Sequence, residues 1–317
     1  MRIVVVGAGL SGLVAARELA DRHEVTVLDK GRSVGGRLAT RRIGDGVVDH
    51  GAQFFTVRGD AFAEQVADWE ARGLAHVWCH GFHDRADGYP RYVGSNGMNS
   101  LAKDLATGLD VRTNQLVFAL RRQEEGWNAV IDDGSVVHAD AVVLTCPIAQ
   151  SWSLLVETDL EVPEELYRSA YHRTIGLLTL LDAPSAVPAP GGVQFDPDDD
   201  TNPFGFIGDN QAKGISPAPA VTFHATQPWS SDHWDDDIDD LRAALLERAA
   251  PWIGDAGVVE AHVKKWRFAG PVTPWPDACW VDDELGAVLA GDLFAGPKVE
   301  GAFNSGRAAA AAIAALA

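Results

Sequence analysis

The distribution of apolar and polar residues predicts a βαβ unit at the beginning of the chain. The β-branched run RIVVVG comes first, followed by the helical pattern SGLVAARELADR and a second apolar strand, EVTVLD. Two short strands joined by a helix are typical of a parallel sheet. Near the other end, AVLAGD and an alanine-rich helical segment repeat the order of strand and helix. We therefore expect both ends of the chain to belong to one domain.

The middle of the chain predicts a series of short strands. Strand-like patterns occur in VRTNQLVFALRR, GWNAVIDDG and SVVHADAVVLTCP, and DDG is a favourable hairpin turn between the last two. The run AVVLTCP is apolar enough for a strand buried on both faces of a parallel sheet. Apolar residues at helical spacing predict helices over 61–75, 96–109 and 238–252.

The composition changes between about residue 150 and residue 285, where proline, tryptophan and aspartate become more frequent. This part predicts a separate domain built on an antiparallel sheet. Its strand-like runs are TIGLLTLLDA, FGFIG, AVTFHATQPW and AHVKKWRF.

A glycine-rich motif follows the first strand and begins the first helix. Gly7, Gly9 and Gly12 form GxGxxG, and Asp29 ends the next strand. In such a motif the first glycine permits the tight turn, the second lets a diphosphate approach the backbone, and the third lets helix and sheet pack closely. A carboxylate at the end of the second strand accepts hydrogen bonds from ribose hydroxyls. The motif predicts a bound dinucleotide; a glycine-rich turn without a ligand is the lesser alternative.

Two further segments bear on which dinucleotide is bound. Gly35, Gly36 and Arg37 follow the carboxylate, where glycines let the backbone approach a ligand and an arginine suits a diphosphate. An ordinary glycine loop accounts equally well for that spacing. Near the C-terminus, Asp292 ends a strand and VEGAFNSG begins a helix, whose N-terminus suits the electron-rich edge of a flavin. A helix or loop cap is the alternative role for Asp292.

Charge and cysteine usage narrow the partners. The formal net charge is −19, which disfavours nucleic acid. Three cysteines without metal-ligand spacing make a zinc site or a disulfide framework improbable. The sequence shows neither a secretory signal nor an apolar run long enough to span a bilayer. We expect a cytoplasmic protein that binds no metal, no nucleic acid and no membrane.

Together the motifs resemble glutathione-reductase-type flavoproteins of the amine-oxidase-like branch, and more closely the renalase family. The similarity runs over essentially the whole chain and is most specific in the pattern DKxxxxGGR together with DxGAQF. The matching segments are DKGRSVGGRLATRR, VDHGAQFFTVR, TFHATQPWS, KKWRFAGP and GDLFAGPKVEGAFNSG.

The resemblance implies a p-hydroxybenzoate-hydroxylase-like α/β fold, in which an antiparallel-sheet substrate domain is inserted into a Rossmann-type FAD-binding domain. The implied FAD-binding domain comprises 1–60, 96–150 and 286–317. The implied substrate domain comprises 61–95 and 151–285. FAD is expected to be bound non-covalently, because the C-terminal segment lacks the cysteine that tethers flavin in monoamine oxidases.

Site residues carry over by position. Gln53 and Phe54 are implied to lie with their backbone beside the reactive edge of the flavin, and Val117 to hold the adenine. His224 and Trp266 are the expected catalytic residues and are implied to line the substrate side of the flavin. The expected cofactor-binding residues are Gly7, Gly9, Ser11, Gly12, Asp29, Lys30, Gly36, Arg37, Gln53, Phe54, Val117, Asp292 and Val299.

The implied reaction is oxidation of the 2- or 6-dihydro isomers of NAD(P)H to NAD(P)⁺, with O₂ reduced to H₂O₂. Loss of hydride restores an aromatic pyridinium, so such a site needs aromatic walls and polar anchors rather than strong acids and bases. Apart from the resemblance, a tryptophan and a histidine on strands are more often core residues, and this remains the alternative for Trp266 and His224.

Other flavin chemistries remain open. Amine oxidases of this branch usually carry a lysine near the flavin; by order of elements it would fall near Thr179 or Leu180, where none occurs, although Lys264 or Lys265 could substitute spatially. An amino-acid oxidase or a desaturase would share every FAD motif. A non-catalytic FAD-binding protein is the least favoured alternative.

Overall fold

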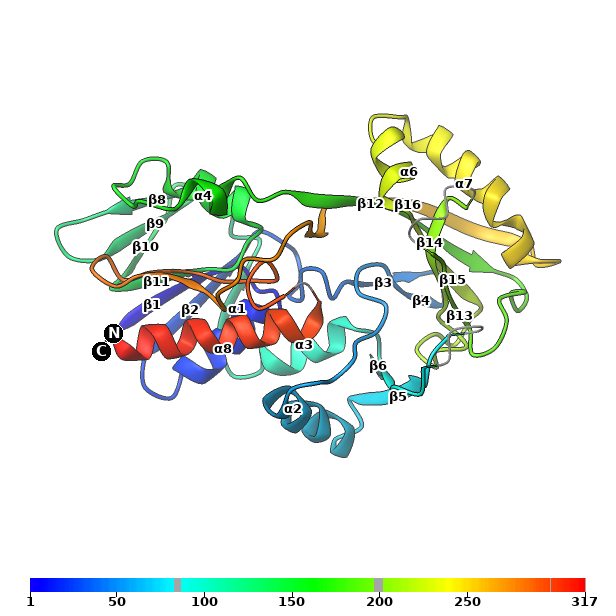
Figure 1. Ribbon diagram of the computed structural model, residues 1–317, viewed down its shortest axis with the longest axis horizontal. Helices are drawn as coiled ribbons and strands as arrows, with labels where there is room; N and C mark the ends of the chain where they lie inside the picture. The colour runs from blue at the N-terminus through cyan, green and yellow to red at the C-terminus, as the bar shows by residue number, and fades with distance from the viewer. Residues whose placement is uncertain (83–86, 197–201, 297, 317) are drawn as a thin grey trace. The chain divides into compact units, whose positions relative to one another are not determined.

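The chain passes four times between two units (Figure 1). Unit 1 comprises Met1–Arg37, Leu101–Ala170 and Gly270–Ala317, and unit 2 comprises Leu38–Ser100 and Tyr171–Ala269. The structure is a computed structural model that describes residues 1–82, 87–196, 202–296 and 298–316.

Unit 1 is built on a mixed sheet whose central strand is β1 (Arg2–Val6). Strand β1 pairs in parallel with β2 (Glu24–Asp29) on one side and with β11 (Ala141–Leu144) on the other. The central strands are almost wholly buried, as their continuous apolar runs require. Outside them lie β7 (Asp110–Thr113), β18 (Ala287–Leu289) and the antiparallel edge strand β17 (Trp280–Asp282).

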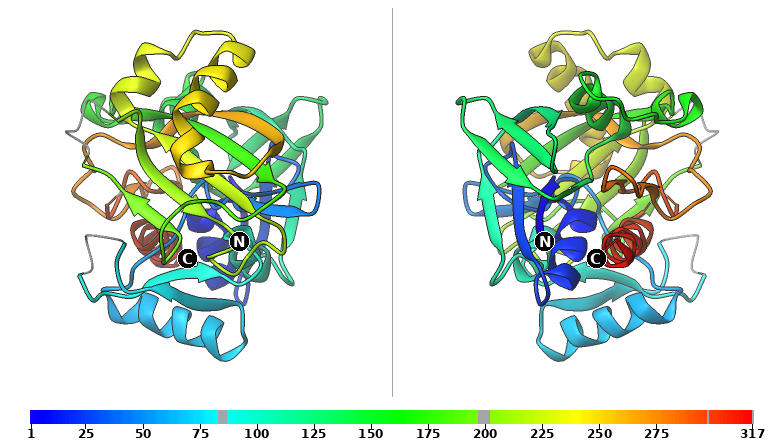
Figure 2. Two further views of the ribbon diagram at one scale, coloured as in Figure 1. Left: turned by 90° about the vertical axis from the view of Figure 1, so that its right-hand side faces the viewer. Right: turned by 90° about the vertical axis from the view of Figure 1, so that its left-hand side faces the viewer.

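Helices α1 (Leu10–Leu19) and α8 (Val299–Ala315) lie side by side in unit 1, which the views of Figures 1 and 2 both show. Small residues allow this close approach: a Cβ on Gly306 would lie 2.3 Å from the carbonyl oxygen of Ser11. Unit 1 also contains the antiparallel strands β8 (Val117–Arg122), β9 (Trp127–Ile131) and β10 (Val136–Ala139), and helices α4 (Ile148–Leu155) and α5 (Glu164–Tyr167).

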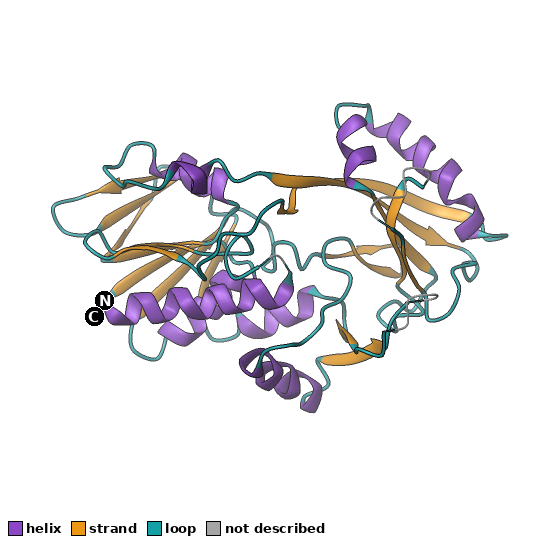
Figure 3. Cartoon of the chain, viewed as in Figure 1, coloured by secondary structure: helices purple, strands orange, loops and turns teal. Residues whose placement is uncertain are grey.

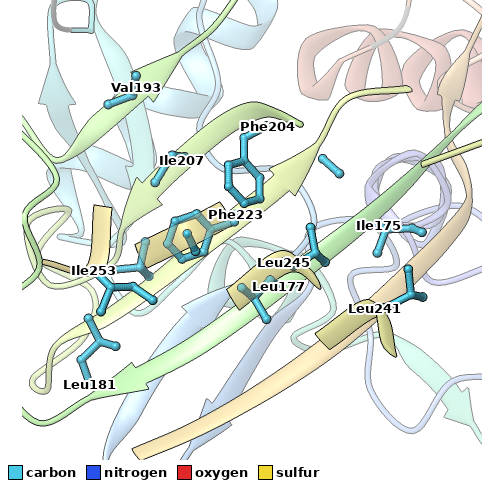
Figure 4. Close-up of a cluster of buried hydrophobic side chains, with 13 residues drawn as sticks. Ile175, Leu177, Leu181, Val193, Phe204, Ile207, Phe223, Leu241, Leu245 and Ile253 are labelled. Carbon is cyan, nitrogen blue, oxygen red and sulfur yellow. The ribbon is translucent and has the colours of Figure 1, made fainter. Parts of the chain in front are cut away.

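Unit 2 contains a five-stranded sheet within its described residues, in the order β13-β14-β15-β12-β16. Helix α7 (Ile238–Ile253) packs on one face of the sheet (Figure 3), and Leu241 and Leu245 of α7 lie against Ile175, Leu177 and Phe223 (Figure 4). The strands are β12 (Tyr171–Leu181), β13 (Gly192–Gln194), β14 (Phe204–Asp209), β15 (Ala220–Ala225) and β16 (Val258–Pro271).

Two hairpins and three helices complete the description of the chain. The hairpin of β3 (Thr40–Ile43) and β4 (Gly46–Asp49) packs through Ile43 and Val48 against Leu178 and Leu180 of β12. The other elements are β5 (Ala75–Cys79), β6 (Arg91–Gly94), α2 (Asp60–Ala71), α3 (Asn99–Leu105) and α6 (Gln227–Asp232).

The predicted fold class is confirmed, and so are the three helices, the parallel pairing of AVVL and the DDG hairpin. Three predicted strands differ. VRTNQLVFALRR divides into β7 and β8 because Asn114, at a φ of 55°, turns the chain between two sheets. SVVHADAVVLTCP divides at Asp140, and in AVTFHATQPW strand β15 ends at Ala225 because Thr226 caps helix α6.

The two units also divide the chain differently from the predicted domains. Residues 38–60 and 96–100 belong to unit 2, where β4 lies against β15. Residues 151–170 and 270–285 belong to unit 1, where α4 packs on β8 and β17 extends the mixed sheet. Within the described ranges, no helix has both the length and the apolarity that a bilayer crossing demands.

Candidate cofactor and substrate sites

Glycine suits the three fingerprint positions of unit 1 for different structural reasons. Gly7 has a φ of 111°, which an L-residue rarely adopts. A Cβ on Gly12 would lie 2.0 Å from the carbonyl oxygen of Gly7, so only glycine fits there. Gly9 has an ordinary extended backbone, with φ −75° and ψ 179°, and a Cβ on it would meet no atom within 4 Å. The space beside Gly9, at the N-terminus of α1, therefore suits a ligand.

The glycine pair of the second segment lies directly against this turn. Gly9 and Gly35 form an isolated parallel bridge, and the amide of Gly35 donates to the carbonyl of Ala8 at 2.7 Å. Gly36 has a φ of 53°, and a Cβ on it would lie 3.4 Å from Cα of Gly9. Residues 35 and 36 are thus part of the wall of the space beside Gly9.

Asp29 closes the turn from the end of β2. Its Oδ2 accepts the amide of Ala8 and its Oδ1 accepts the amide of Gly31, both at 2.6 Å. Each carboxylate oxygen has further acceptor capacity, so the role predicted for Asp29 toward ribose hydroxyls is compatible with these bonds. Lys30 extends outward and donates to Oε1 of Gln150 at 3.2 Å.

Arg37 and Asp292, predicted separately as cofactor residues, form a two-pronged ion pair. Nη2 of Arg37 lies 2.6 Å from Oδ1 of Asp292, and Nη1 bonds the other carboxylate oxygen. Both side chains are largely buried. The preceding Gly291 is fixed on α8, because its amide donates to Oγ of Ser305. The ion pair thus joins the second and third predicted segments.

Three other predicted cofactor residues lie in unit 1. Ser11 is 4% exposed, and its Oγ has no hydrogen-bond partner among the described residues. Val117 is buried at the start of β8, and Val299 is buried in the first turn of α8. A buried hydroxyl without a partner at a helix N-terminus is compatible with a bound diphosphate.

In unit 2, the predicted substrate residues meet at one carbonyl oxygen. Trp266 donates its indole N–H to the carbonyl of His50 at 2.6 Å. Nε2 of His224 lies 3.2 Å from the same oxygen, which fixes the proton of this imidazole on Nε2. Thr222 donates to the carbonyl of Asp49 at 2.8 Å. Side chains of strands β15 and β16 thus fix the backbone carbonyls of residues 49 and 50 by hydrogen bonds.

Both imidazoles at this point are neutral at pH 7. Burial, together with smaller contributions from the nearby charges of Lys264 and Arg41, lowers the pKa of His50 to about 4. Burial likewise lowers the pKa of His224 to about 4. The His50 ring stacks on Trp266 with centroids 5.5 Å apart, and Nζ of Lys264 lies 4.8 Å from the Trp266 ring centroid.

Gln53 and Phe54, also predicted as cofactor residues, belong to unit 2. The Gln53 side chain is buried and bonded there: Nε2 donates to the carbonyls of Asp49 and Gly51, and Oε1 accepts from Lys213 at 3.0 Å. Phe54 is half-buried, with its ring centroid 5.0 Å from that of Phe82. These bonds of the side chain are compatible with the predicted backbone role of residue 53, which stays a prediction.

Lys213 is a residue that the sequence analysis missed. Its side chain is fully buried, with Nζ 3.4 Å from Oδ2 of Asp49 and 3.4 Å from Oδ1 of Asn210. Burial lowers the pKa of Lys213, whereas the charge of Asp49 opposes that shift. NQAKG reads as a polar loop, and nothing in its spacing indicates that the lysine is buried. The positions near Thr179 and Leu180 are buried within β12, as their apolar surroundings suggest.

Comparison with protein families decides the membership of the chain. A family model described as flavin containing amine oxidoreductase matches residues 60–314. The chain belongs to this family. A model described as NAD(P)-binding Rossmann-like domain matches residues 5–68, which include the fingerprint turn. For this flavin-containing amine oxidoreductase, FAD is confirmed as the cofactor.

Curated relatives match in short segments. Polyamine oxidase 1 from Oryza sativa is 39% identical over 97 residues, which cover 26% of this chain and 19% of the relative. The flavin-dependent L-tryptophan oxidase RebO from Lentzea aerocolonigenes is 52% identical over 46 residues, covering 14% of this chain and 10% of the relative. The matches thus span a fifth or less of these relatives.

Solved structures match over nearly the full length. A protein from Exiguobacterium sp. 255-15, provisionally named a protoporphyrinogen oxidase, has a TM-score of 0.76 at 15% identity, covering 99% of this chain and 98% of the other. Putrescine oxidase bound to putrescine has a TM-score of 0.68 at 15% identity and covers 99% of both chains. At this identity the similarity shows the fold alone.

The residues of unit 1 fit the cofactor that the family requires. The space beside Gly9, the unpartnered Oγ of Ser11 and the carboxylate of Asp29 offer room and polar groups for a diphosphate and a ribose. Once bound, FAD supplies an acceptor for a hydride or for two electrons. The individual FAD contacts predicted from the sequence remain predictions.

Proposed function

We propose that this family member is an oxidase of the renalase type, which acts on the 2- or 6-dihydro isomers of NAD(P)H. The substrate loses a hydride and becomes NAD(P)⁺. FAD, when bound, would supply the two-electron acceptor for this hydride; in the overall balance O₂ gains the two electrons and two protons, one of them from the hydride, and leaves as H₂O₂. FAD is held without a covalent bond by unit 1, and the substrate is held by unit 2.

The observation that carries this proposal is the charge around His50. His50 and His224 are neutral at pH 7, whereas Lys264 and Arg41 lie near enough to lower the pKa of His50. The carboxylate of Asp49 is buried and faces Lys213. A protonated amine would be repelled by these cations, while a dinucleotide, which carries a diphosphate, would be attracted.

The proton chemistry of the residues also supports the proposal. A dihydronicotinamide isomer gives up hydride readily because the product is an aromatic pyridinium, so neither a strong base nor a strong acid is needed. His224 and Trp266 each donate a ring N–H to the carbonyl of His50, so these N–H groups position residues 49–50. Their rings contribute an apolar wall rather than a proton relay.

Anaerobic reduction of the bound flavin tests this proposal. The purified holoenzyme is mixed with one equivalent of 2- or 6-dihydro-NAD(P), of ordinary NADH, or of a polyamine, and the flavin absorbance is followed. The proposal predicts complete bleaching by at least one dihydro isomer and none by NADH or the polyamine. Bleaching by the polyamine but by neither isomer would overturn it.

A flavin amine oxidase is the second candidate, and three observations favour it. The family match covers most of the chain, and Polyamine oxidase 1 is among the relatives. In addition, unit 2 contains a buried lysine, Lys213, bonded to Gln53. The titration with a polyamine, repeated with monoamines and amino acids, decides between the two candidates.

A further inference from the structure

Arg41 and Lys264 are two cations of this acidic chain that lie near the predicted substrate residues. Many arginines are paired with a carboxylate, and the buried lysine faces Asp49. Such pairs involve Arg2, Arg37, Arg72, Arg91, Arg112, Arg121, Arg168, Arg242, Arg307 and Lys213. Within the described ranges, neither Arg41 nor Lys264 forms an ion pair with a carboxylate. Arg41 contacts His262, two residues before Lys264 on β16, so two positive charges lie on this part of unit 2 and favour an anionic ligand there.

The two cations converge on the substrate residues from different elements. Arg41 extends from β3, and its Nη2 lies 3.5 Å from Nδ1 of His262 on β16. Lys264 is two residues further along β16, with its ammonium over the Trp266 ring. Both charges lower the pKa of His50, the residue stacked on Trp266. Arg41 and Lys264 therefore flank the stacked pair of His50 and Trp266.

The surroundings leave these charges available. Glu260 bonds to Nε2 of His262 at 2.5 Å, and Nδ1 of the same imidazole faces Arg41, so the carboxylate is not paired directly with either cation. Lys264 is half-buried against an aromatic ring, where its charge is less screened than in open water. Arg41 is exposed, and its planar guanidinium can bind two oxygens of one phosphate.

We propose that Arg41 and Lys264 bind the diphosphate of the substrate and so select dinucleotides over uncharged dihydronicotinamides. This inference rests on the proposed function and adds the part of the substrate that is recognised. The diphosphate has two negative charges, which matches the two cations in number. Binding of the diphosphate, which does not react, then places the nicotinamide ring near His50 and Trp266 of unit 2.

Binding of ADP-ribose to the holoenzyme tests the anion site without any redox step. Calorimetry is run on the wild type, on Arg41→Gln and on Lys264→Met. The matched controls are Arg42→Gln and Arg267→Gln, which each remove an exposed arginine. Arg42 follows Arg41 on β3, and Arg267 lies three residues after Lys264 on β16. Each test variant should weaken binding about tenfold, and each control less than about twofold. Added salt should weaken wild-type binding and have less effect on the test variants.

Kinetics with two substrates separate this inference from the proposed function. The dihydronicotinamide dinucleotide isomer is compared with its riboside, which has no phosphate. Arg41→Gln and Lys264→Met should raise KM for the dinucleotide about tenfold while changing KM for the riboside less than about twofold. If both substrates reduce the flavin but the variants match the wild type, the anion site is refuted and the function stands. If neither substrate reduces the flavin, the function fails, and ADP-ribose binding still decides the anion site.

Discussion

Replacing Gly9 by alanine should abolish tight FAD binding while leaving the fold intact. The backbone of Gly9 lies in an extended region that alanine adopts freely, and the added methyl group would touch no atom within 4 Å. A less flexible unfolded chain favours alanine by about 0.4–1 kcal/mol, whereas alanine is a poorer helix N-cap than glycine by a comparable amount. We therefore expect the free energy of unfolding of the apoprotein to change by less than about 0.5 kcal/mol.

The same methyl group would occupy the space in which the diphosphate approaches the N-terminus of α1. Losing one or two charge-assisted hydrogen bonds to backbone amides costs about 3 kcal/mol, which corresponds to about 100-fold weaker FAD binding. The assay is fluorescence titration of apoprotein with FAD, alongside urea unfolding of the same samples. The affinity for FAD should fall without a change in the unfolding midpoint.

Two other glycines provide the controls. Gly12→Ala would bring a Cβ to 2.0 Å from the carbonyl of Gly7, so this variant should lose several kcal/mol of stability, about 3 or more. Gly205→Ala in β14 would make only an ordinary contact at 3.8 Å and should change neither property. Unchanged FAD affinity in Gly9→Ala would refute a diphosphate site beside Gly9. Unfolding of that variant would show that Gly9 is needed for packing instead.

Three other predictions follow from buried or paired charges. Lys213→Met leaves Asp49 buried without its cation and should lower the free energy of unfolding, measured in urea, by about 3–5 kcal/mol. Adding Asp49→Asn should restore part of this loss, and equal stability of Lys213→Met and the wild type would show that the ion pair contributes no net stability. Because the folded pKa of His50 and of His224 is about 4 rather than 6.5, stability is fully present above pH 6.5 and should fall by about 3 kcal/mol per histidine as the pH drops toward 4. Urea unfolding at several pH values checks this, and His224→Gln should flatten the slope. Asp292→Asn breaks the ion pair with Arg37 and should weaken FAD binding about tenfold by titration, whereas an unchanged affinity would remove both residues from the cofactor site.

The parts of the structure that could be predicted are those in which neighbouring residues specify their own conformation. The fingerprint glycines, the strand ending at Asp29 and the helix over 238–252 follow from local spacing, because turn sterics and helical periodicity act within a few residues. The DDG hairpin is predictable for the same reason.

The parts that could not be predicted depend on contacts between distant segments. The β3–β4 hairpin joins unit 2 because Val48 meets Leu178, which is far along the chain. Lys213 is buried only because Asp49 and Gln53 lie opposite it, and the pairing of Arg37 with Asp292 spans 255 positions. The periodicity of a single sequence does not reveal such contacts between distant residues.

The central claim, that the chain oxidises dihydronicotinamide isomers with FAD, is tested most directly by a single-turnover experiment. The holoenzyme is mixed without oxygen with one equivalent of the 2-dihydro isomer of NAD(P)H, of the 6-dihydro isomer or of an amine, and flavin absorbance and NAD(P)⁺ are measured together. The account predicts one NAD(P)⁺ per flavin reduced, and one H₂O₂ when oxygen is admitted. A flavin that stays oxidised with both the 2- and the 6-dihydro isomers, yet is reduced by an amine, would contradict it.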